Sequence, residues 1–389
     1  MNAHAPRAPL AQPAARVLSA LVLALALLLA ALAAAASAKP IPGHYIVTVK
    51  QDEDPRGVAR AVQASPRHVY TSALNGFAAQ LNAGQLNALR HNPHVELIEQ
   101  DAEVSATATQ YMDAAGDPWG LDRIDQRPLP LSKTYSYTKD GSTVRAYILD
   151  TGLQADHTQF GGRAMNIYNA TTGGAADCNG HGTHVAGTVG ARTFGVAKNV
   201  YLRGVKVLGG DCSKNGTWAD VIEGVDWVKA KHIKPAVANM SLGGGALTSV
   251  NTAVNNLVAA GVFVAVSAGN DNVDACTASP ASAASAYTTA SSTKTDAKSG
   301  FSNWGSCVDG YAPGSSIKSS TLGGGSGWMS GTSMASPHVA GVGALLCSYG
   351  PSYCTPSFVT SWINTWATSG AISGNPAGTP NRLLWKGGL

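Results

Sequence analysis

Short apolar runs alternate with segments of helical periodicity through the larger part of this chain. Residues 200–207, 237–240 and 262–266 are apolar runs of strand length, as in the buried strands of a parallel sheet. After the first of them, apolar residues recur at helical spacing, at Trp218, Val221, Ile222, Val225 and Val228. We therefore expect an α/β fold, a parallel sheet with helices on both faces, in residues 108–389, a length that suits one ample core.

The N-terminus has the pattern of a secretory signal. Arg7 and Arg16 precede an Ala/Leu-rich run over residues 17–36, and Ala36-Ser37-Ala38 provides a small-residue cleavage site. Residues 1–38 are therefore predicted to be a signal peptide, and the protein to be secreted to the extracellular space. The run is also long enough to span a bilayer, so an uncleaved anchor is the alternative.

A separate small unit is expected over residues 39–107. Residues 44–49 and 95–101 have the composition of strands, and residues 81–89 that of a helix. Two strand–helix–strand halves predict a small α+β domain of the ferredoxin-like kind. A generic recognition domain is the alternative.

Ser333 has the surroundings of a nucleophile. It lies among small residues, between the glycine-rich residues 323–327 and the apolar run 339–346. Small neighbours let a substrate backbone approach the hydroxyl closely. A helix beginning there also directs its unpaired N–H groups at any negative charge that develops nearby.

A serine nucleophile needs a base and an acid that orients the base. His181 lies in a small-residue segment, and Asp150 follows the apolar strand 144–149, so the chain order is Asp, His, Ser. An α/β-hydrolase needs its acid after the serine, and no Asp or Glu follows Ser333. The chymotrypsin order puts His first, on an all-β fold. The remaining known order, Asp-His-Ser, is that of subtilisin.

These motifs also match two other kinds of site. Asp150-Thr-Gly is also the motif of aspartic proteases, which need a second copy that this chain lacks. His181 and His184 are three residues apart and could hold a metal, but a zincin needs Glu where Gly182 stands.

Four blocks carry a family resemblance: YILDTG, NGHGTHVAG, VSAGN and GTSMASPHVAG. They are similar, in this order, to the signature blocks of the subtilisin-like serine proteases, and the chain most resembles the secreted proteinase K and aqualysin branch. The resemblance implies a subtilisin-like catalytic domain over residues 108–389 and an inhibitory propeptide over residues 39–107. It also implies that His181 is the base, that His184 is structural, and that Asn270 donates to the oxyanion together with the backbone N–H of Ser333.

The implied function is that of a secreted serine endopeptidase, made as a zymogen and working through an acyl-enzyme. Ser105–Gln110 is the expected autoprocessing region, because small residues fit an extended strand in a cleft. The expected partners are protein and peptide substrates and the chain's own propeptide, which acts as intramolecular chaperone and inhibitor. Once processed, the protein is expected to be a monomer with no membrane partner. No nucleic-acid partner is expected, because a net charge of +4 is too small to indicate nucleic-acid binding. A catalytically silent binding protein is the rival reading, which the intact Asp-His-Ser-Asn set disfavours.

By the same resemblance, two segments form the substrate site. One wall of the primary pocket is implied at Ser241, Leu242, Gly243, Ala268 and Gly269, and a facing strand at Lys214, Asn215 and Gly216. Lys214 stands where relatives have small residues. These segments contain no carboxylate, so we expect broad cleavage after apolar or aromatic residues.

Six cysteines, an even number in an exported chain, indicate disulfides, although six allow 15 pairings. The aqualysin-like relatives suggest Cys178–Cys212 and Cys276–Cys307, and proximity in sequence suggests Cys347–Cys354. A metal site is the competing reading, and the chain has no Cys-x-x-Cys pair to support it.

Structural calcium is also implied by the resemblance. Asp309 aligns with a calcium carboxylate of the family, with the backbone carbonyls of Ala284 and Ala286 as companions. A second site is matched in part by Asp122, Asp125 and Gln126. Ser132 and Thr134 occupy two further ligand positions of that second site.

Overall fold

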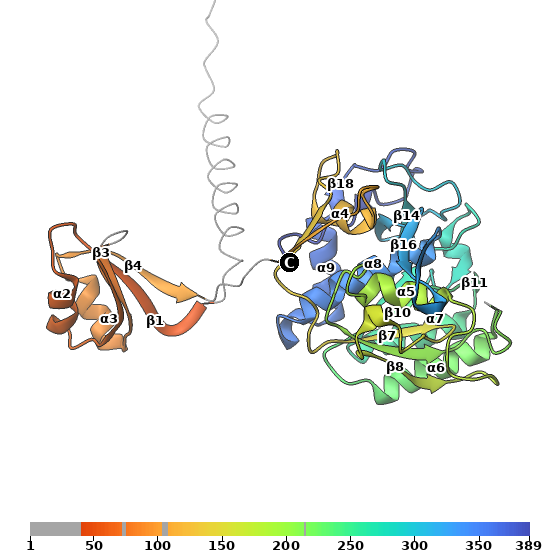
Figure 1. Ribbon diagram of the computed structural model, residues 1–389, viewed down its shortest axis with the longest axis horizontal. Helices are drawn as coiled ribbons and strands as arrows, with labels where there is room; N and C mark the ends of the chain where they lie inside the picture. The colour runs from red at the N-terminus through yellow and green to blue at the C-terminus, as the bar shows by residue number, and fades with distance from the viewer. Residues whose placement is uncertain (1–39, 72–74, 103–107, 214) are drawn as a thin grey trace, which may run out of the picture. The chain divides into compact units, whose positions relative to one another are not determined.

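The computed structural model describes residues 40–71, 75–102, 108–213 and 215–389 (Figure 1). The predicted signal peptide and Lys214 lie outside them. The chain divides into two compact units, Met1–Ala106 and Thr107–Leu389, which are described separately below. In the described residues no helix has both the length and the apolar character needed to cross a membrane.

The smaller unit is a four-stranded antiparallel sheet with two helices. Its elements are β1 (Pro40–Val49), α2 (Pro55–Ala61), β2 (Pro66–Thr71), β3 (Asn75–Gln80), α3 (Ala83–Arg90) and β4 (Val95–Ala102). The strand order β2-β3-β1-β4 and the β-α-β-β-α-β sequence are those of a ferredoxin-like domain, as expected. Asp54 and Asn82 cap the two helices, and Val47, Phe77 and Leu89 lie fully buried in the core.

The larger unit is built on a nine-stranded sheet in the order β18-β19-β15-β14-β12-β10-β7-β9-β8. Its main strands are β7 (Arg145–Asp150), β8 (Ala164–Asn169), β9 (Tyr201–Lys206), β10 (Ala236–Met240), β12 (Phe263–Ser267), β14 (Tyr287–Ser292) and β15 (Gly310–Pro313). Neighbours in this set pair in parallel, as predicted, and only the short strands β18 (Thr368–Ser369) and β19 (Arg382–Leu383) pair antiparallel. The predicted strands of 200–207, 237–240 and 262–266 correspond to β9, β10 and β12.

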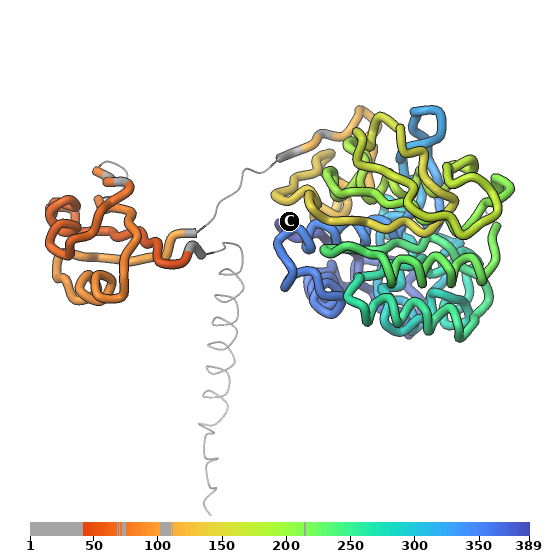
Figure 2. Tube along the Cα trace, turned by 90° about the horizontal axis from the view of Figure 1, so that it is seen from below, coloured from red at the N-terminus to blue at the C-terminus, as the bar shows by residue number. Residues whose placement is uncertain are grey.

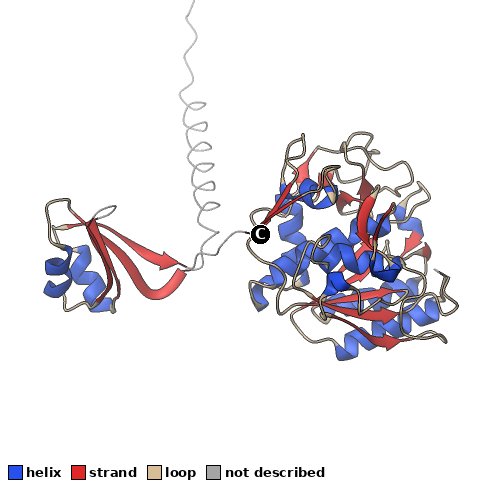
Figure 3. Cartoon of the chain, viewed as in Figure 1, coloured by secondary structure: helices blue, strands red, loops and turns tan. Residues whose placement is uncertain are grey.

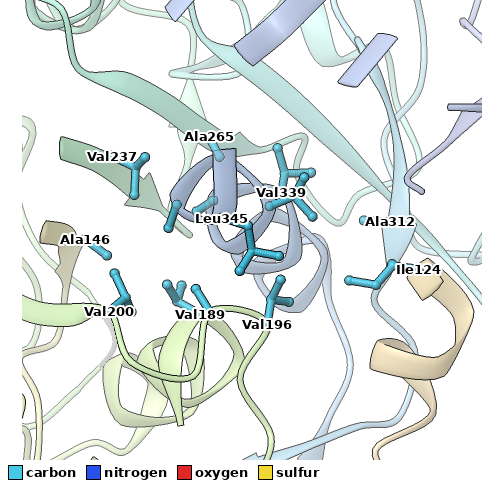
Figure 4. Close-up of a cluster of buried hydrophobic side chains, with 14 of the residues drawn as sticks. Ile124, Ala146, Val189, Val196, Val200, Val237, Ala265, Ala312, Val339 and Leu345 are labelled. Atoms are coloured by element: carbon cyan, nitrogen blue, oxygen red, sulfur yellow. The ribbon is translucent and has the colours of Figure 1, made fainter. Parts of the chain in front are cut away.

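Helices cover both faces of this sheet (Figure 3). One core packs α5 (His181–Gly190), α8 (Thr332–Cys347) and α9 (Pro356–Trp366) against the sheet, and Figure 4 shows its centre around Val189, Val339 and Leu345. A second core lies under α6 (Trp218–Lys231) and α7 (Thr248–Ala259) on the other face. Successive residues of strand β7 pack into opposite cores: Ile148 lies in the first core and Leu149 in the second.

Short elements complete the larger unit. They are β5 (Ala108–Tyr111) paired with β6 (Thr134–Tyr137), α4 (Trp119–Asp125), β11 (Gly244–Gly245) paired with β13 (Ala278–Ser279), and the hairpin β16 (Ile317–Ser320) with β17 (Ser326–Met329). The C-terminal segment returns to α4, as Figure 2 shows at the marked chain end. There the backbone N–H of Lys386 donates to the carbonyl of Ile124 at 2.8 Å.

Candidate active site

Asp150 and His181 meet at the carboxyl end of strand β7. Asp150 is the last residue of β7 and fully buried, and His181 is the first residue of helix α5. Nδ1 of His181 lies 2.7 Å from Oδ1 of Asp150, and the backbone N–H of Thr151 donates to the same oxygen at 2.8 Å. A carboxylate at Nδ1 fixes the ring's orientation and tautomer, so Nε2 is the nitrogen that can accept a proton.

Asp177 anchors the beginning of α5. Its Oδ1 accepts the N–H of Gly180 and the hydroxyl of Thr151, both at 2.9 Å, and its Oδ2 accepts the N–H of Thr183 at 2.9 Å. Oγ1 of Thr151 in turn accepts the N–H of Gly182 at 2.9 Å. These bonds join the first turn of α5 to the loop after β7. Asp177 is not among the residues predicted from the sequence, although an acidic residue ahead of a helix is a capping signal.

Ser333 is the second residue of helix α8 and is half-buried. Its Oγ donates to the backbone carbonyl of Ser241 at 3.2 Å. Backbone N–H groups in a helix's first turn have no partner within the helix, so this position is suited to an anion. Ser333 and His181 line the same cleft, which has a volume of about 740 Å³.

Asn270 follows strand β12 and reaches the beginning of α8. Its Oδ1 accepts the backbone N–H of Thr332 at 2.8 Å and the hydroxyl of Thr332 at 3.0 Å. Those two bonds fix which side of the amide faces α8, so the Nδ2 donors lie on the opposite side of the group. Asn270 lines the cleft together with Ser333. The amide is therefore oriented to donate a hydrogen bond to a ligand there.

Most of the expected substrate residues line the cleft. They are Asn215, Gly216, Ser241, Leu242 and Gly243. Ala268 and Gly269 are not part of its described lining: Ala268 is fully buried, and a Cβ at Gly269 would lie 2.3 Å from Nδ2 of Asn303. Two lining residues, Trp218 and Met329, are not predicted from the sequence, in which Trp218 fits a helix face.

All six cysteines pair in the structure, and none is free. The bridges are those expected, namely Cys178–Cys212, Cys276–Cys307 and Cys347–Cys354. The first bridge joins the segment before His181 to the loop before Asn215. Nδ2 of Asn179 adds a hydrogen bond to the carbonyl of Cys212 at 3.1 Å. This bridge therefore ties the histidine segment to one wall of the cleft.

Two buried histidines lie next to the site. Nε2 of His184 donates to the carbonyls of Ile317 at 3.0 Å and Gly327 at 3.2 Å, which ties α5 to the β16–β17 hairpin. Nδ1 of His338 bonds the carbonyl of Met334 at 2.9 Å. Burial lowers the pKa of each histidine to about 4, so both rings are neutral at neutral pH. Both are placed to stabilise the structure.

The first expected calcium position fits a hard cation. Burial raises the pKa of Asp309 to about 6, which a bound cation would oppose. Oδ2 of Asp309 accepts the N–H of Thr288 at 2.8 Å, beside the segment 284–286 whose carbonyls are the expected companions.

The second expected calcium position does not fit a cation. The carboxylate of Asp122 accepts the N–H and the hydroxyl of Ser132 at 3.2 and 3.0 Å, and Oδ1 of Asp125 pairs with Nζ of Lys386 at 2.9 Å. Oε1 of Gln126 accepts the N–H of Ser132 at 2.9 Å, and the Ser132 hydroxyl bonds that of Thr134 at 2.8 Å. Hydrogen-bond donors already hold the oxygens that calcium would need.

Comparison with known proteins assigns this fold to the serine proteinases. The chain belongs to the subtilase family: the model of that family (peptidase S8) matches residues 141–382, and the peptidase inhibitor I9 model matches residues 44–107.

Individual relatives agree with this assignment. The chain is 45% identical over 374 residues to an extracellular serine proteinase of Thermus sp. (strain Rt41A), covering 89% of this chain and 90% of that one. It is 41% identical over 326 residues to proteinase R of Parengyodontium album, covering 81% and 82%. The crystal structure of a cold adapted subtilisin-like serine proteinase superposes with a TM-score of 0.67 at 50% identity, covering 69% of this chain and 97% of that one. The expected proteinase K branch is thereby confirmed.

Proposed function

We propose that this subtilase is a secreted endopeptidase, made as a zymogen, that hydrolyses peptide bonds in proteins through an acyl-enzyme. The observation that carries the proposal is the 2.7 Å contact between His181 and Asp150 in a cleft that Ser333 also lines. The extracellular relative supports secretion, and the I9 domain supports synthesis as a zymogen.

In this mechanism Ser333 Oγ attacks the carbonyl carbon of the scissile peptide bond while Nε2 of His181 takes the hydroxyl proton. Asp150 holds the imidazole and stabilises the imidazolium that forms. His181 then gives the proton to the leaving amine, which departs and leaves the acyl-enzyme. A water molecule, activated by the same imidazole, hydrolyses the ester and restores Ser333.

Asn270 and the backbone N–H of Ser333 stabilise the tetrahedral intermediate. The carbonyl oxygen becomes an anion during attack, and Nδ2 of Asn270 donates to it. Support comes from the two bonds of Thr332 to Oδ1 of Asn270, which orient the amide before substrate arrives. An oriented donor needs no reorganisation when the charge develops.

The substrate lies as an extended strand between the segments 215–216 and 241–243, joined to both by main-chain hydrogen bonds. Described lining residues of the cleft include no carboxylate, and they include Leu208, Trp218, Val221, Leu242 and Met329. An apolar or aromatic preference follows, because a buried basic side chain would find no counter-charge there. Ala268 and Gly269 support the primary pocket from behind the residues that line it.

The propeptide over residues 39–107, of which the I9 model matches 44–107, acts as intramolecular chaperone and inhibitor until the chain cuts itself in the small-residue stretch 105–110. The signal peptide over residues 1–38 directs export, and the processed enzyme works as a monomer without a membrane partner. Asp309 and the carbonyls of Ala284 and Ala286 would hold a structural calcium ion. The support is that Asp309 lies beside this segment, where its Oδ2 accepts the N–H of Thr288 at 2.8 Å.

A fluorophosphonate probe tests the catalytic proposal, because it reacts only with an activated serine. We expect the purified protein, once freed of its propeptide, to be labelled at Ser333. Ser333→Ala should abolish labelling, whereas Ser326→Ala, which removes an exposed serine of the preceding strand, should leave it unchanged. A processed wild-type protein that takes up no probe would favour the silent binding protein instead.

A further inference from the structure

Helix α8 cannot satisfy the backbone carbonyl of its own Ser333. In an α-helix the carbonyl of residue i accepts the N–H of residue i+4, and the residue four positions after Ser333 is Pro337. Proline has no N–H, so the expected donor is missing. The hydroxyl of Ser241 replaces it, donating to the Ser333 carbonyl at 2.7 Å. The nucleophile's carbonyl is thus bonded by a residue of the cleft wall.

Ser241 is itself held by a buried amide. Nδ2 of Asn239 donates to Oγ of Ser241 at 2.9 Å, and Oδ1 of Asn239 accepts the hydroxyl of Ser336 at 2.7 Å. Ser336 lies three residues after Ser333, on the same helix. The bonds therefore form a ring that leaves α8 at Ser333, crosses to strand β10, and returns to α8 at Ser336.

The ring of hydrogen bonds is buried, and the donor in each bond is defined. Asn239 and Ser336 are fully buried, and Ser241 is 2% exposed. A hydroxyl has one proton to donate. Because Nδ2 of Asn239 donates to Oγ of Ser241, the hydroxyl proton of Ser241 points away from Asn239 and is donated to the carbonyl of Ser333. Ser333 closes a second link, since its Oγ donates to the Ser241 carbonyl at 3.2 Å. The hydroxyl of Ser241 is therefore committed to α8 and not to a substrate.

We propose that Asn239 is a positioning residue for catalysis, which acts through Ser241 to fix Ser333 against the wall along which the substrate lies. This inference rests on the proposed function. Because Pro337 removes the internal bond, the first turn of α8 takes its position from β10. Ser333 and the cleft wall at Ser241 are then held in a fixed position relative to each other. The Oγ and the backbone N–H of Ser333 therefore keep a constant distance to the scissile bond of a substrate that lies along this wall. A misplacement of about 1 Å costs about a hundredfold in rate.

The alternative is that the ring only satisfies buried polar groups, and a double variant separates the two. In Ser241→Ala the Ser333 carbonyl loses its donor, so both stability and catalysis should fall. Adding Pro337→Ala returns a helical N–H to that carbonyl, which should recover stability without restoring the link to β10. Asn239→Asp is a second, nearly isosteric probe, because a carboxylate accepts the Ser241 proton and turns it away from Ser333.

The measurements are kcat and KM on a peptide substrate, the rate of fluorophosphonate labelling, and Tm. We expect kcat and the labelling rate to fall about tenfold to a hundredfold in Ser241→Ala and Asn239→Asp, with KM changed by less than about threefold. In Pro337→Ala/Ser241→Ala, Tm should return towards that of Pro337→Ala, while kcat stays low. Ser291→Ala, which removes a buried hydroxyl bonded to Ser299, should lower Tm and leave kcat unchanged.

Recovery of kcat together with Tm in the double variant would overturn the proposal and leave the ring a purely structural role. So would wild-type kcat in the folded Asn239→Asp protein. Failure of the wild type to react with the fluorophosphonate is a different result, because it removes the proposed function itself.

Discussion

Thr332 binds the side chain of Asn270 through two hydrogen bonds that end on the same amide oxygen. Its backbone N–H donates to Oδ1 at 2.8 Å and its hydroxyl at 3.0 Å, and the hydroxyl also accepts the N–H of Gly269 at 3.1 Å. Thr332 is fully buried, whereas Asn270 is exposed. A buried residue thus orients an exposed donor at the mouth of the cleft.

Asn270→Ala should lower kcat by about 10² to 10³, a loss already known for such a donor in the relative subtilisin, and should leave KM nearly unchanged. The reason is that Nδ2 contacts the substrate oxygen only after it has become an anion. Steady-state kinetics on a peptide substrate measure this. Asn199→Ala serves as the control, because Asn199 is exposed and bonds Asp140 away from the cleft. A rise in KM with normal kcat would contradict an oxyanion role.

Thr332→Val should lower kcat by about tenfold, because it removes the hydroxyl that orients Asn270 while it retains the backbone bond. Thr332→Ser keeps the hydroxyl and should restore most of the activity. In an Asn270→Ala background the valine substitution should have little further effect, which a double-mutant cycle measures. Additive losses in that cycle would mean that Thr332 acts independently of Asn270.

The sequence predicted those residues of the site that can be recognised from their amino-acid type and their order along the chain. Asp150, His181 and Ser333 could be selected because only one known arrangement of acid, base and nucleophile matches their order along the chain. The alternation of strands and helices likewise predicted the doubly covered parallel sheet, because burial on two faces shows directly in the composition of β10 and β12.

The supporting contacts could not be predicted, because they join residues that are adjacent only after folding. Asn239 reads as an ordinary polar residue at the end of a strand, and its role depends on Ser336, which is 97 positions away. Lys386 and Asp125 are further apart still, and their ion pair occupies a carboxylate oxygen of the second expected calcium position. Trp218 fits a helix face, and only the placement of the first turn of α6 puts it at the cleft.

Replacing both cysteines of the Cys178–Cys212 bridge by serine should destabilise the protein by about 2 to 4 kcal/mol and raise KM. The bridge ties the histidine segment to the loop that leads to Asn215, so its loss frees one wall of the cleft. Urea unfolding and kinetics on a peptide substrate measure the two effects. Cys347–Cys354 is the matched control, because its two cysteines are only 7 positions apart, lie away from the cleft, and should not alter KM. Equal KM changes in both variants would contradict this assignment.

Millimolar calcium added to metal-free enzyme should raise Tm in the wild type, and Asp309→Asn should abolish the rise. Asparagine still accepts the N–H of Thr288, so the variant loses the charge and keeps the bond. The pKa of Asp309 in the metal-free protein is raised to about 6 by burial, so protons should compete and the calcium effect should weaken below that pH. Calorimetry measures it, and an equal shift in the variant would place the ion elsewhere.

The buried rings of His184 and His338 should make the protein less stable as pH falls from about 6.5 to about 4. Burial lowers the pKa of His184 and His338 to about 4 in the folded state, below the 6.5 of the unfolded chain. Between those values the unfolded chain binds protons that the folded protein does not, so the free energy of unfolding rises with pH, by about 1.4 kcal/mol per pH unit for each such group. Asp309, whose pKa is raised to about 6, opposes this trend in the metal-free protein.

His338→Asn isolates one of these contributions. It removes a buried titratable ring, so the slope of unfolding free energy against pH between 4 and 6.5 should decrease by about one proton, even if the variant is less stable throughout. Urea unfolding at a series of pH values in saturating calcium, with the nucleophile replaced to prevent self-digestion, measures this slope. Asn199→Ala changes an exposed residue that does not titrate, and should leave the slope as it is. A slope identical in His338→Asn and wild type would mean that the folded protein protonates this ring as readily as the unfolded chain does.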